Sequence, residues 1–191
     1  YQVSRKLTAL EAQDLVAVRN VVEVLQRIEM VTRIATEIEH NLVELGTDGR
    51  LVRLQLEELM EGVDDDRRLI LTDYLQPSSD MSPEEAMKAL TELNDEALFD
   101  DLRMSRSLHL IGPANDLDET VEPRGFRLLS KLPHINEAHV VRVVDHFGSL
   151  RKILGATVEE LEAVEGIGAS RARALKDGAA RLAGDSIIDQ Y

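Results

Sequence analysis

A pair of glycines near the C-terminal end, followed by basic side chains, has the spacing of a phosphate-binding turn. Glycine at both positions permits backbone conformations that are costly for other residues, and it lets the main chain approach a phosphate without a Cβ atom in the way. A helix that starts after the turn would direct its free N–H groups and the positive end of its dipole at a phosphate oxygen. Such contacts read the nucleic-acid backbone and not its sequence. The residues expected to bind are Gly166, Ile167, Gly168, Ala169, Ser170, Arg171, Arg173 and Lys176.

A degenerate copy of the same unit lies upstream, between residues 128 and 144. Pro133 and Asn136 stand where the second copy has its glycines, so this hairpin is expected to fit a phosphate less well. Lys131 and Asn136 are its candidate DNA-binding residues. Gly148 is a predicted helix stop, and Thr157 with Glu160 predicts a capping box that opens the second unit. The doubled unit is typical of a tandem helix-hairpin-helix domain, which holds the two strands of a duplex across the minor groove.

Other interpretations of these residues are weaker. A dinucleotide-binding loop is excluded because Arg171 stands where a third glycine is needed and no strand precedes the turn. A hairpin domain that binds only protein remains an alternative, although basic residues clustered on one helix of an acidic chain favour DNA. The five histidines have no partner three or four residues away, and the runs 64–66 and 100–101 are interpreted as acidic helix starts. No metal site and no catalytic residue are therefore predicted.

The charge of the chain is divided unevenly along its 191 residues. Residues 1–123 hold 12 basic and 27 acidic side chains, a net charge of −15, whereas residues 124–183 hold 10 and 7, a net charge of +3. This change of sign falls next to the polar stretch 112–119 and predicts a domain boundary. We expect a helical spine domain over residues 1–120 and a tandem helix-hairpin-helix domain over residues 121–191. Any DNA-binding face must be local in a chain with a net charge of −14.

The composition excludes several classes of protein. Three Phe, three Tyr and no Trp disfavour a platform on which single-stranded bases stack. The absence of cysteine excludes disulfides, thiolate zinc sites and thiol redox chemistry, and it suits a reducing cytoplasm. No apolar run has the roughly 18 residues needed to span a bilayer, and the start at Tyr1 has no signal-peptide pattern and no initiator Met. We expect a cytoplasmic fragment of a longer chain, without a membrane partner.

The spine is expected to be helical throughout. Thr8 and Glu11 predict a capping box, after which apolar residues recur at alternating spacings of four and three up to Leu45. This pattern predicts one helix of about 36 residues and about 55 Å, ended by Gly46 and Gly49. It could form a coiled coil between subunits, but its apolar stripe is wider than a coiled-coil seam and favours the longest helix of a bundle.

Three shorter helices should follow, at 51–61, at 64–75 and in a segment opened by Ser82-Pro83-Glu84-Glu85. No part of the spine shows the alternation of a strand. The predicted fold class is all-α, an elongated helical spine domain followed by a compact tandem helix-hairpin-helix domain.

The chain as a whole resembles the DisA family of DNA integrity scanning proteins. The resemblance rests on residues 43–51, on residues 121–129 and on the paired hairpins, and it covers about residues 1–183, corresponding to the C-terminal two-thirds of that family. It implies an N-terminal diadenylate cyclase domain that condenses two ATP into cyclic di-AMP with Mg or Mn. It also implies assembly of the full-length protein into octamers, hairpin domains that engage branched DNA such as Holliday junctions, and a location on the nucleoid.

The resemblance implies no catalysis by this chain. The cyclase domain of the family carries an Arg-His-Arg motif that this sequence lacks, and Asp177-Gly178-Ala179 falls within the final hairpin helix, where it is a chance match to the second cyclase motif. ATP and the metal are expected only for the missing domain, so no cofactor is expected here. The function predicted is sequence-independent binding of branched DNA, and the alternative is a helical protein-interaction or oligomerisation scaffold that does not bind DNA.

Overall fold

The computed structural model describes residues 7–11, 16–42, 49–76, 78–112, 114–133 and 135–188, except for the side chains of residue 179 and of residues 182–188. This described part is helical, as predicted, and contains no strand apart from an isolated bridge between Ala17 and Thr120. None of its helices is long and apolar enough to cross a membrane.

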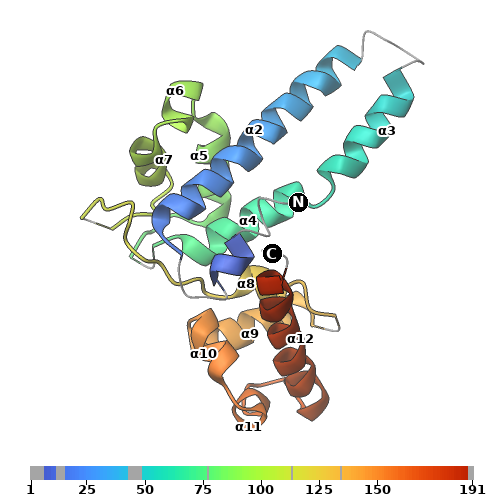
Figure 1. Ribbon diagram of the computed structural model, residues 1–191, viewed down its shortest axis with the longest axis vertical. Helices are drawn as coiled ribbons and strands as arrows, with labels where there is room; N and C mark the ends of the chain where they lie inside the picture. Colours follow the sequence, from blue (N-terminus) through green and yellow to red (C-terminus); the bar gives the residue numbers. More distant parts are fainter. Residues whose placement is uncertain are drawn as a thin grey trace.

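Residues 7–11 are helical, and eleven further helices follow among the described residues. Their bounds are α2 (Val18–Leu42), α3 (Gly49–Met60), α4 (Val63–Tyr74), α5 (Pro83–Glu92), α6 (Asp95–Leu98), α7 (Asp101–Ser107), α8 (Phe126–Leu129), α9 (Glu137–Phe147), α10 (Leu150–Gly155), α11 (Val158–Glu162) and α12 (Ala169–Ile188). Figure 1 shows α2 to α7 in one half of the molecule and α8 to α12 in the other.

The prediction of one helix from Thr8 to Leu45 is wrong. Val16 and Ala17 are not helical, because the backbone of residues 119–121 pairs with them. The N–H of Val121 donates to the oxygen of Val16 at 2.8 Å, and the N–H of Val18 donates to the oxygen of Glu119 at 3.1 Å. The longest helix of the first half therefore begins only at Val18. Its predicted end at Gly46 lies outside the described residues, and Gly49 begins α3 instead of ending a helix.

The capping box predicted at Thr8 and Glu11 is also wrong. Thr8 lies within the helical stretch 7–11 and not before it. Glu11 is buried, and its carboxylate accepts hydrogen bonds from the Tyr74 hydroxyl at 2.7 Å and from the Arg127 guanidinium. The boxes at Ser82 with Glu85 and at Thr157 with Glu160 are confirmed, and so is the helix stop at Gly148, which has a φ of 79°.

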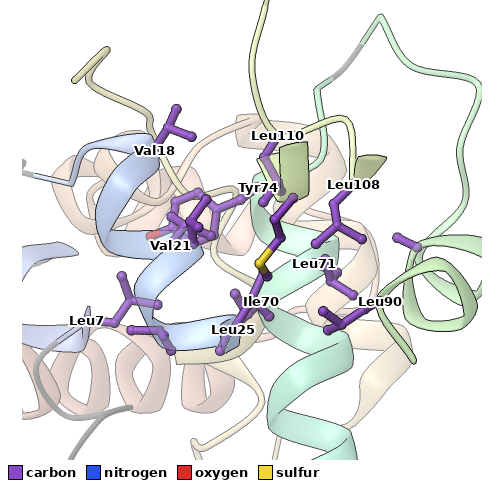
Figure 2. Packing of buried hydrophobic residues seen from close by; sticks show 14 of the residues in the cluster. Leu7, Val18, Val21, Leu25, Ile70, Leu71, Tyr74, Leu90, Leu108 and Leu110 are labelled. Atoms are coloured by element: carbon purple, nitrogen blue, oxygen red, sulfur yellow. The ribbon is translucent and has the colours of Figure 1, made fainter. Parts of the chain in front are cut away.

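The hydrophobic core of the first half lies between the first part of α2 and helices α4, α5 and α7 (Figure 2). Val21 and Leu25 on α2 pack with Ile70 and Leu71 on α4, and Leu90 of α5 closes the cluster. All five side chains are at most 1% exposed. This burial fixes α4, which in turn carries the contacts to the second half.

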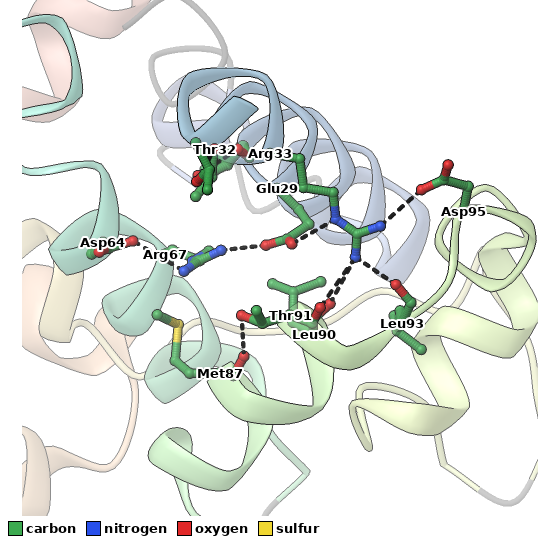
Figure 3. Close-up of polar contacts among 12 residues, drawn as sticks. Glu29, Thr32, Arg33, Asp64, Arg67, Met87, Leu90, Thr91, Leu93 and Asp95 are labelled. Carbon is green, nitrogen blue, oxygen red and sulfur yellow. Dashed lines mark hydrogen bonds and ion pairs between the residues drawn. The ribbon is translucent and has the colours of Figure 1, made fainter. Parts of the chain in front are cut away.

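A buried ionic network holds α2 against α4 and α5 (Figure 3). The Glu29 carboxylate, which is 1% exposed, accepts from Arg33 at 2.9 Å and from Arg67. Arg33 also donates to the oxygen of Leu93 at 2.6 Å, just past the end of α5, and pairs with Asp95. The positive charges of Arg33 and Arg67, and the hydrogen bonds that they donate to Glu29, compensate the cost of burying the Glu29 carboxylate.

The second half has its own hydrophobic cluster, and Asp73 joins it to α4. The buried residues of this cluster lie between Leu128 and Leu175 in the sequence. The Asp73 carboxylate accepts hydrogen bonds from the backbone N–H groups of Gly125, Phe126 and Arg127 at 2.7 to 3.0 Å, at the start of α8. The first helix of the hairpin half is therefore capped by a side chain of the other half.

Candidate nucleic-acid interface

The second hairpin connects α11 to α12 through residues 163–168. Gly166 has a φ of 83°, in the left-handed region, so the turn itself requires glycine there. Ile167 is 3% exposed and belongs to the core cluster, and its N–H donates to the oxygen of Val164 at 3.0 Å. Ile167 therefore anchors the turn from within and exposes the backbone on either side of it. Its predicted role in the core is confirmed, which leaves only its backbone for a DNA contact.

The start of α12 is open to solvent. Gly168, the residue before it, has no side chain that could cap the helix, and a Cβ placed there would meet no atom within 4 Å. The first four residues include no acid, and residues 169–171 are exposed. The N–H of Ala172 donates to the oxygen of Gly168 at 3.0 Å, so the N–H groups of residues 169–171 precede the first helical bond. This end can receive an anion through its N–H groups and its dipole.

Two arginines from different helices lie against this turn. Arg171 of α12 donates to the backbone oxygen of Gly166 at 3.3 Å, and Arg142 of α9 donates to that of Glu165 at 3.3 Å. A Cβ on Gly166 would lie 2.3 Å from Nη1 of Arg142 and 4.0 Å from the His139 ring. Arg142 and His139 were not among the predicted residues. The sequence held no sign of their role, because the fold alone brings α9 to a turn more than 20 residues away.

The first hairpin differs from the second at the helix that follows it. Asn136 is the N-cap of α9, and its side-chain oxygen accepts the His139 N–H at 3.0 Å. Glu137 is the first residue of α9 and places a negative charge where an anion would sit. One of the free N–H groups is thus already satisfied, and the dipole end is already occupied by an acid. The first hairpin is poorly suited to phosphate, and the expected difference between the two copies has this structural basis.

The register of the two copies corrects the prediction made for Pro133. Asn136 precedes α9 as Gly168 precedes α12, so Asn136 matches the second glycine. Counting back from these positions pairs Pro133 with Glu165 and not with Gly166. The residue that matches Gly166 is His134, which lies outside the described residues.

Lys176 and Lys131 are occupied away from the turn. The Lys176 ammonium donates to the backbone oxygens of Leu154 and Ala156, both at 2.7 Å, and so closes the end of α10. Lys131 pairs with Asp66 of α4 at 3.6 Å, and burial lowers its pKa. Lys176 thus has a structural role at α10, and Lys131, a candidate of the first hairpin, has an acidic partner; contact of either ammonium with DNA stays a prediction. Arg173 is exposed on α12, and its contact with DNA stays a prediction.

The glycine of the tripeptide at 177–179 is required by the close packing of α12 against the first hairpin. A Cβ at this position of α12 would lie 2.7 Å from Cδ2 of Leu132, next to the first hairpin. The glycine lets α12 approach the first copy closely, which gives the two hairpins one core. The tripeptide is part of a helix, as expected.

Comparison with known families covers most of the chain. A family model described as the linker region of the DisA bacterial checkpoint controller matches residues 1–116, and a model described as a SAM-like helix-hairpin-helix tandem matches residues 126–181. Proteins named DNA integrity scanning protein DisA are similar over the whole chain. The one from Frankia casuarinae is 47% identical over 191 residues, that from Streptomyces coelicolor is 47% identical over 193, and that from Acidothermus cellulolyticus is 48% identical over 193.

The share of these relatives that the chain covers is smaller than expected. The chain spans 53% of the Frankia casuarinae protein and 52% of each of the other two, about half of their length instead of the predicted two-thirds. The residues matched are those of a linker and of a hairpin tandem.

Proposed function

The chain belongs to the DisA family, and we propose that it binds DNA through the backbone phosphates, independently of base sequence. Its hairpin tandem is a fold consistent with DNA binding. The observation that carries the proposal is the open start of α12, where Gly168 leaves the helix uncapped and Arg142 and Arg171 add positive charge from two helices. Contacts of this kind position a protein on DNA without reading its bases.

The proposed site is small, and this sets the expected affinity. Of the two hairpins in the described part of the chain, the second alone is followed by an uncapped helix start, so we expect one chain to neutralise a few phosphates at most. Affinity should fall in the non-specific range, about 10⁻⁴ to 10⁻⁶ M at physiological salt. The acidic first half, with a net charge of −15 over residues 1–123, weakens binding further at low salt.

We propose that the preference for branched DNA comes from several hairpin domains held in one assembly. Tethering binding sites can raise avidity by about 10² to 10⁴ without a new contact. The arms of a junction diverge and can meet more than one domain, whereas a short linear duplex meets fewer. Homo-oligomerisation of the full-length protein, up to the octamer of the family, and a location on the nucleoid belong to this proposal.

The activity of the full-length protein is likewise a proposal. We place the synthesis of cyclic di-AMP from ATP with Mg or Mn in the half of the relatives that this chain does not span. On this view the 191-residue chain forms no cyclic di-AMP, and the linker transmits the effect of DNA binding from the hairpin domain to the cyclase domain. Product formed by the purified chain above a blank would contradict this division of roles.

Binding is best tested by fluorescence anisotropy with a labelled four-way junction and a linear duplex of equal length. Affinity for both should fall steeply as salt is raised from about 50 to about 200 mM, because each phosphate contact releases a counterion. Linking two chains artificially should increase affinity for the junction more than for the linear duplex. Failure of the chain to bind either DNA, or binding that salt does not change, would favour a protein-interaction scaffold instead.

A further inference from the structure

The outer part of α2 and the whole of α3 form an arm that leads away from the core (Figure 1). We call residues 30–42 of α2 together with α3 the arm. The buried core residues of α2 end with Leu25, and no residue of the arm belongs to either hydrophobic cluster. Ala35 and Leu42 are buried along α2, on the stripe that continues the core positions of this helix. The arm thus lies outside both hydrophobic clusters, and its residue Arg33, at the base of the arm, belongs to the ionic network that holds α2 against α5.

Exposed apolar side chains are concentrated on this arm. Among the described residues, eight of the ten large hydrophobic side chains that are exposed belong to it. Those on α3 include Leu59, Leu51 and Leu54, which are 76%, 67% and 57% exposed. Such a concentration in one place marks an interaction surface, whereas exposed apolar residues scattered singly do not. The eight are Met30, Val31, Ile34, Ile38, Leu51, Val52, Leu54 and Leu59.

The charges of α3 run against its dipole. Arg50 and Arg53 lie near its N-terminus, and Glu57 and Glu58 lie near its C-terminus. Each such placement costs about 0.3 to 1 kcal/mol in an isolated helix, where acids favour the first turn and bases the last. None of these four side chains has an ion pair within the described part of the chain. A partner helix that runs in the opposite direction would supply the missing complementary charges.

We propose that α3 packs antiparallel against α3 of a second copy of this chain, about a two-fold axis beside Leu54. In a helix, residues four apart lie on one face, so Arg50, Leu54 and Glu58 share a face with Leu51 beside them. An antiparallel arrangement centred on residue 54 sets the residue four positions before it opposite the residue four positions after it. Arg50 of each copy therefore faces Glu58 of the other, and the two Leu54 side chains meet at the centre.

This pairing reduces both unfavourable features of α3. Leu54 and the neighbouring Leu51 lose contact with water, and Arg50 and Glu58 each gain a partner of opposite sign. The contact is isologous, so it closes at two copies. It does not depend on DNA binding.

Sedimentation velocity of the 191-residue chain over a roughly hundredfold concentration range tests the pairing, because dimerisation follows mass action. The variants are Arg50→Glu, Glu58→Arg, the double variant with both changes, and Leu54→Asp. Each single charge reversal places like charges opposite one another twice in the dimer, so it should weaken association about tenfold or more. The double variant exchanges the two charges and should restore association. Lys88→Glu on α5, away from the arm, is the matched control and should associate like the unchanged chain.

Circular dichroism should show the same helix content for all variants, since the changed side chains are exposed. Concentration-dependent association that the single variants and Leu54→Asp lose and the double variant regains supports the interface. A chain that stays monomeric throughout, an association that Leu54→Asp leaves intact, or a double variant no better than the single ones overturns it. Because two linked hairpin domains should bind a junction more tightly, DNA binding is compared at concentrations at which every variant is monomeric, where it should not follow these outcomes.

Discussion

Arg142 on α9 donates a hydrogen bond to the backbone oxygen of Glu165, 23 residues further along the chain, at 3.3 Å. A helix of the first hairpin thereby supplies a cation to the turn of the second. The first copy, whose own helix start is capped by Asn136 and followed by Glu137, contributes a side chain to its neighbour's site. The two copies therefore differ at the start of the helix that follows each turn.

Gly168→Ala should weaken DNA binding about tenfold or more while leaving the fold intact. A methyl group at this position meets no protein atom within 4 Å, so stability should change by less than about 1 kcal/mol, but the methyl would stand between the start of α12 and a phosphate. Anisotropy and thermal unfolding measure the two effects. Gly155→Ala, which also meets nothing within 4 Å, is the control and should bind normally. Undiminished affinity of folded Gly168→Ala would remove the turn from the interface.

Arg142→Ala and Arg171→Ala should each weaken binding to every DNA sequence about equally. Each loses one cationic contact, so the slope of log affinity against log salt should decrease by about one. The measurement is a salt titration with two unrelated duplexes. Arg124→Ala, on the loop before α8, removes a cation that pairs with Asp145 and should leave the slope unchanged. A loss confined to one sequence would indicate base contacts.

Lys176→Met should destabilise the hairpin domain without changing the salt slope. The ammonium holds two backbone oxygens at the end of α10, and leaving them unpaired costs about 1 to 3 kcal/mol, whereas methionine retains the apolar stem. Denaturant unfolding gives the stability, and the salt titration gives the slope. A variant of unchanged stability whose slope of log affinity against log salt falls by about one would show that Lys176 contacts a phosphate.

The Asp73 carboxylate of α4, which caps the start of α8, should make the stability of the folded chain depend on pH. Burial raises the pKa of Asp73 to about 6, although its hydrogen bonds from backbone N–H groups act in the opposite direction. The folded chain then binds a proton between about pH 6 and the ordinary value of 3.8 that the unfolded chain does not, so this contribution to stability grows as the pH falls and is lost as the pH rises through 6. Relative to Asp73→Asn, the free energy of unfolding should gain about 1.4 kcal/mol per pH unit below pH 6.

Urea unfolding of both proteins at several pH values between 7 and 4 measures this difference. Circular dichroism establishes that each is folded at every pH. A difference in unfolding free energy that stays constant across the range would show that the Asp73 carboxylate titrates as it does in the unfolded chain.

Replacing Asn136 by Gly together with Glu137 by Ala should strengthen DNA binding several-fold. The change frees the N–H groups at the start of α9 and removes the acid that occupies its dipole end. The double variant should also show a steeper salt dependence, measured by the same titration. Loss of the cap costs about 1 kcal/mol of stability, so unfolding is followed in parallel. Unaltered affinity of the folded variant would place the first hairpin away from DNA altogether.

The sequence by itself determined the helical class, the doubled hairpin and the local helix boundaries that rest on nearby residues. Ser82 with Glu85 and Thr157 with Glu160 cap their helices as predicted, because both partners of each bond lie within one turn. Ile167 fills the core as expected, since its spacing from the apolar residues of the flanking helices is fixed locally.

Tertiary structure alone decided the features that depend on residues distant in sequence. The long periodic helix is interrupted because residues 119–121 pair with Val16 and Ala17, a competition that no local pattern records. The Glu11 carboxylate accepts a hydrogen bond from Arg127, 116 residues further along the chain, instead of capping a helix. Packing places the Lys176 ammonium at the backbone oxygens that end α10, and it places the Arg142 guanidinium at the backbone oxygen of Glu165 in the second hairpin. Long side chains reach whichever partner the packing places near them, so their roles follow from the fold and not from their spacing.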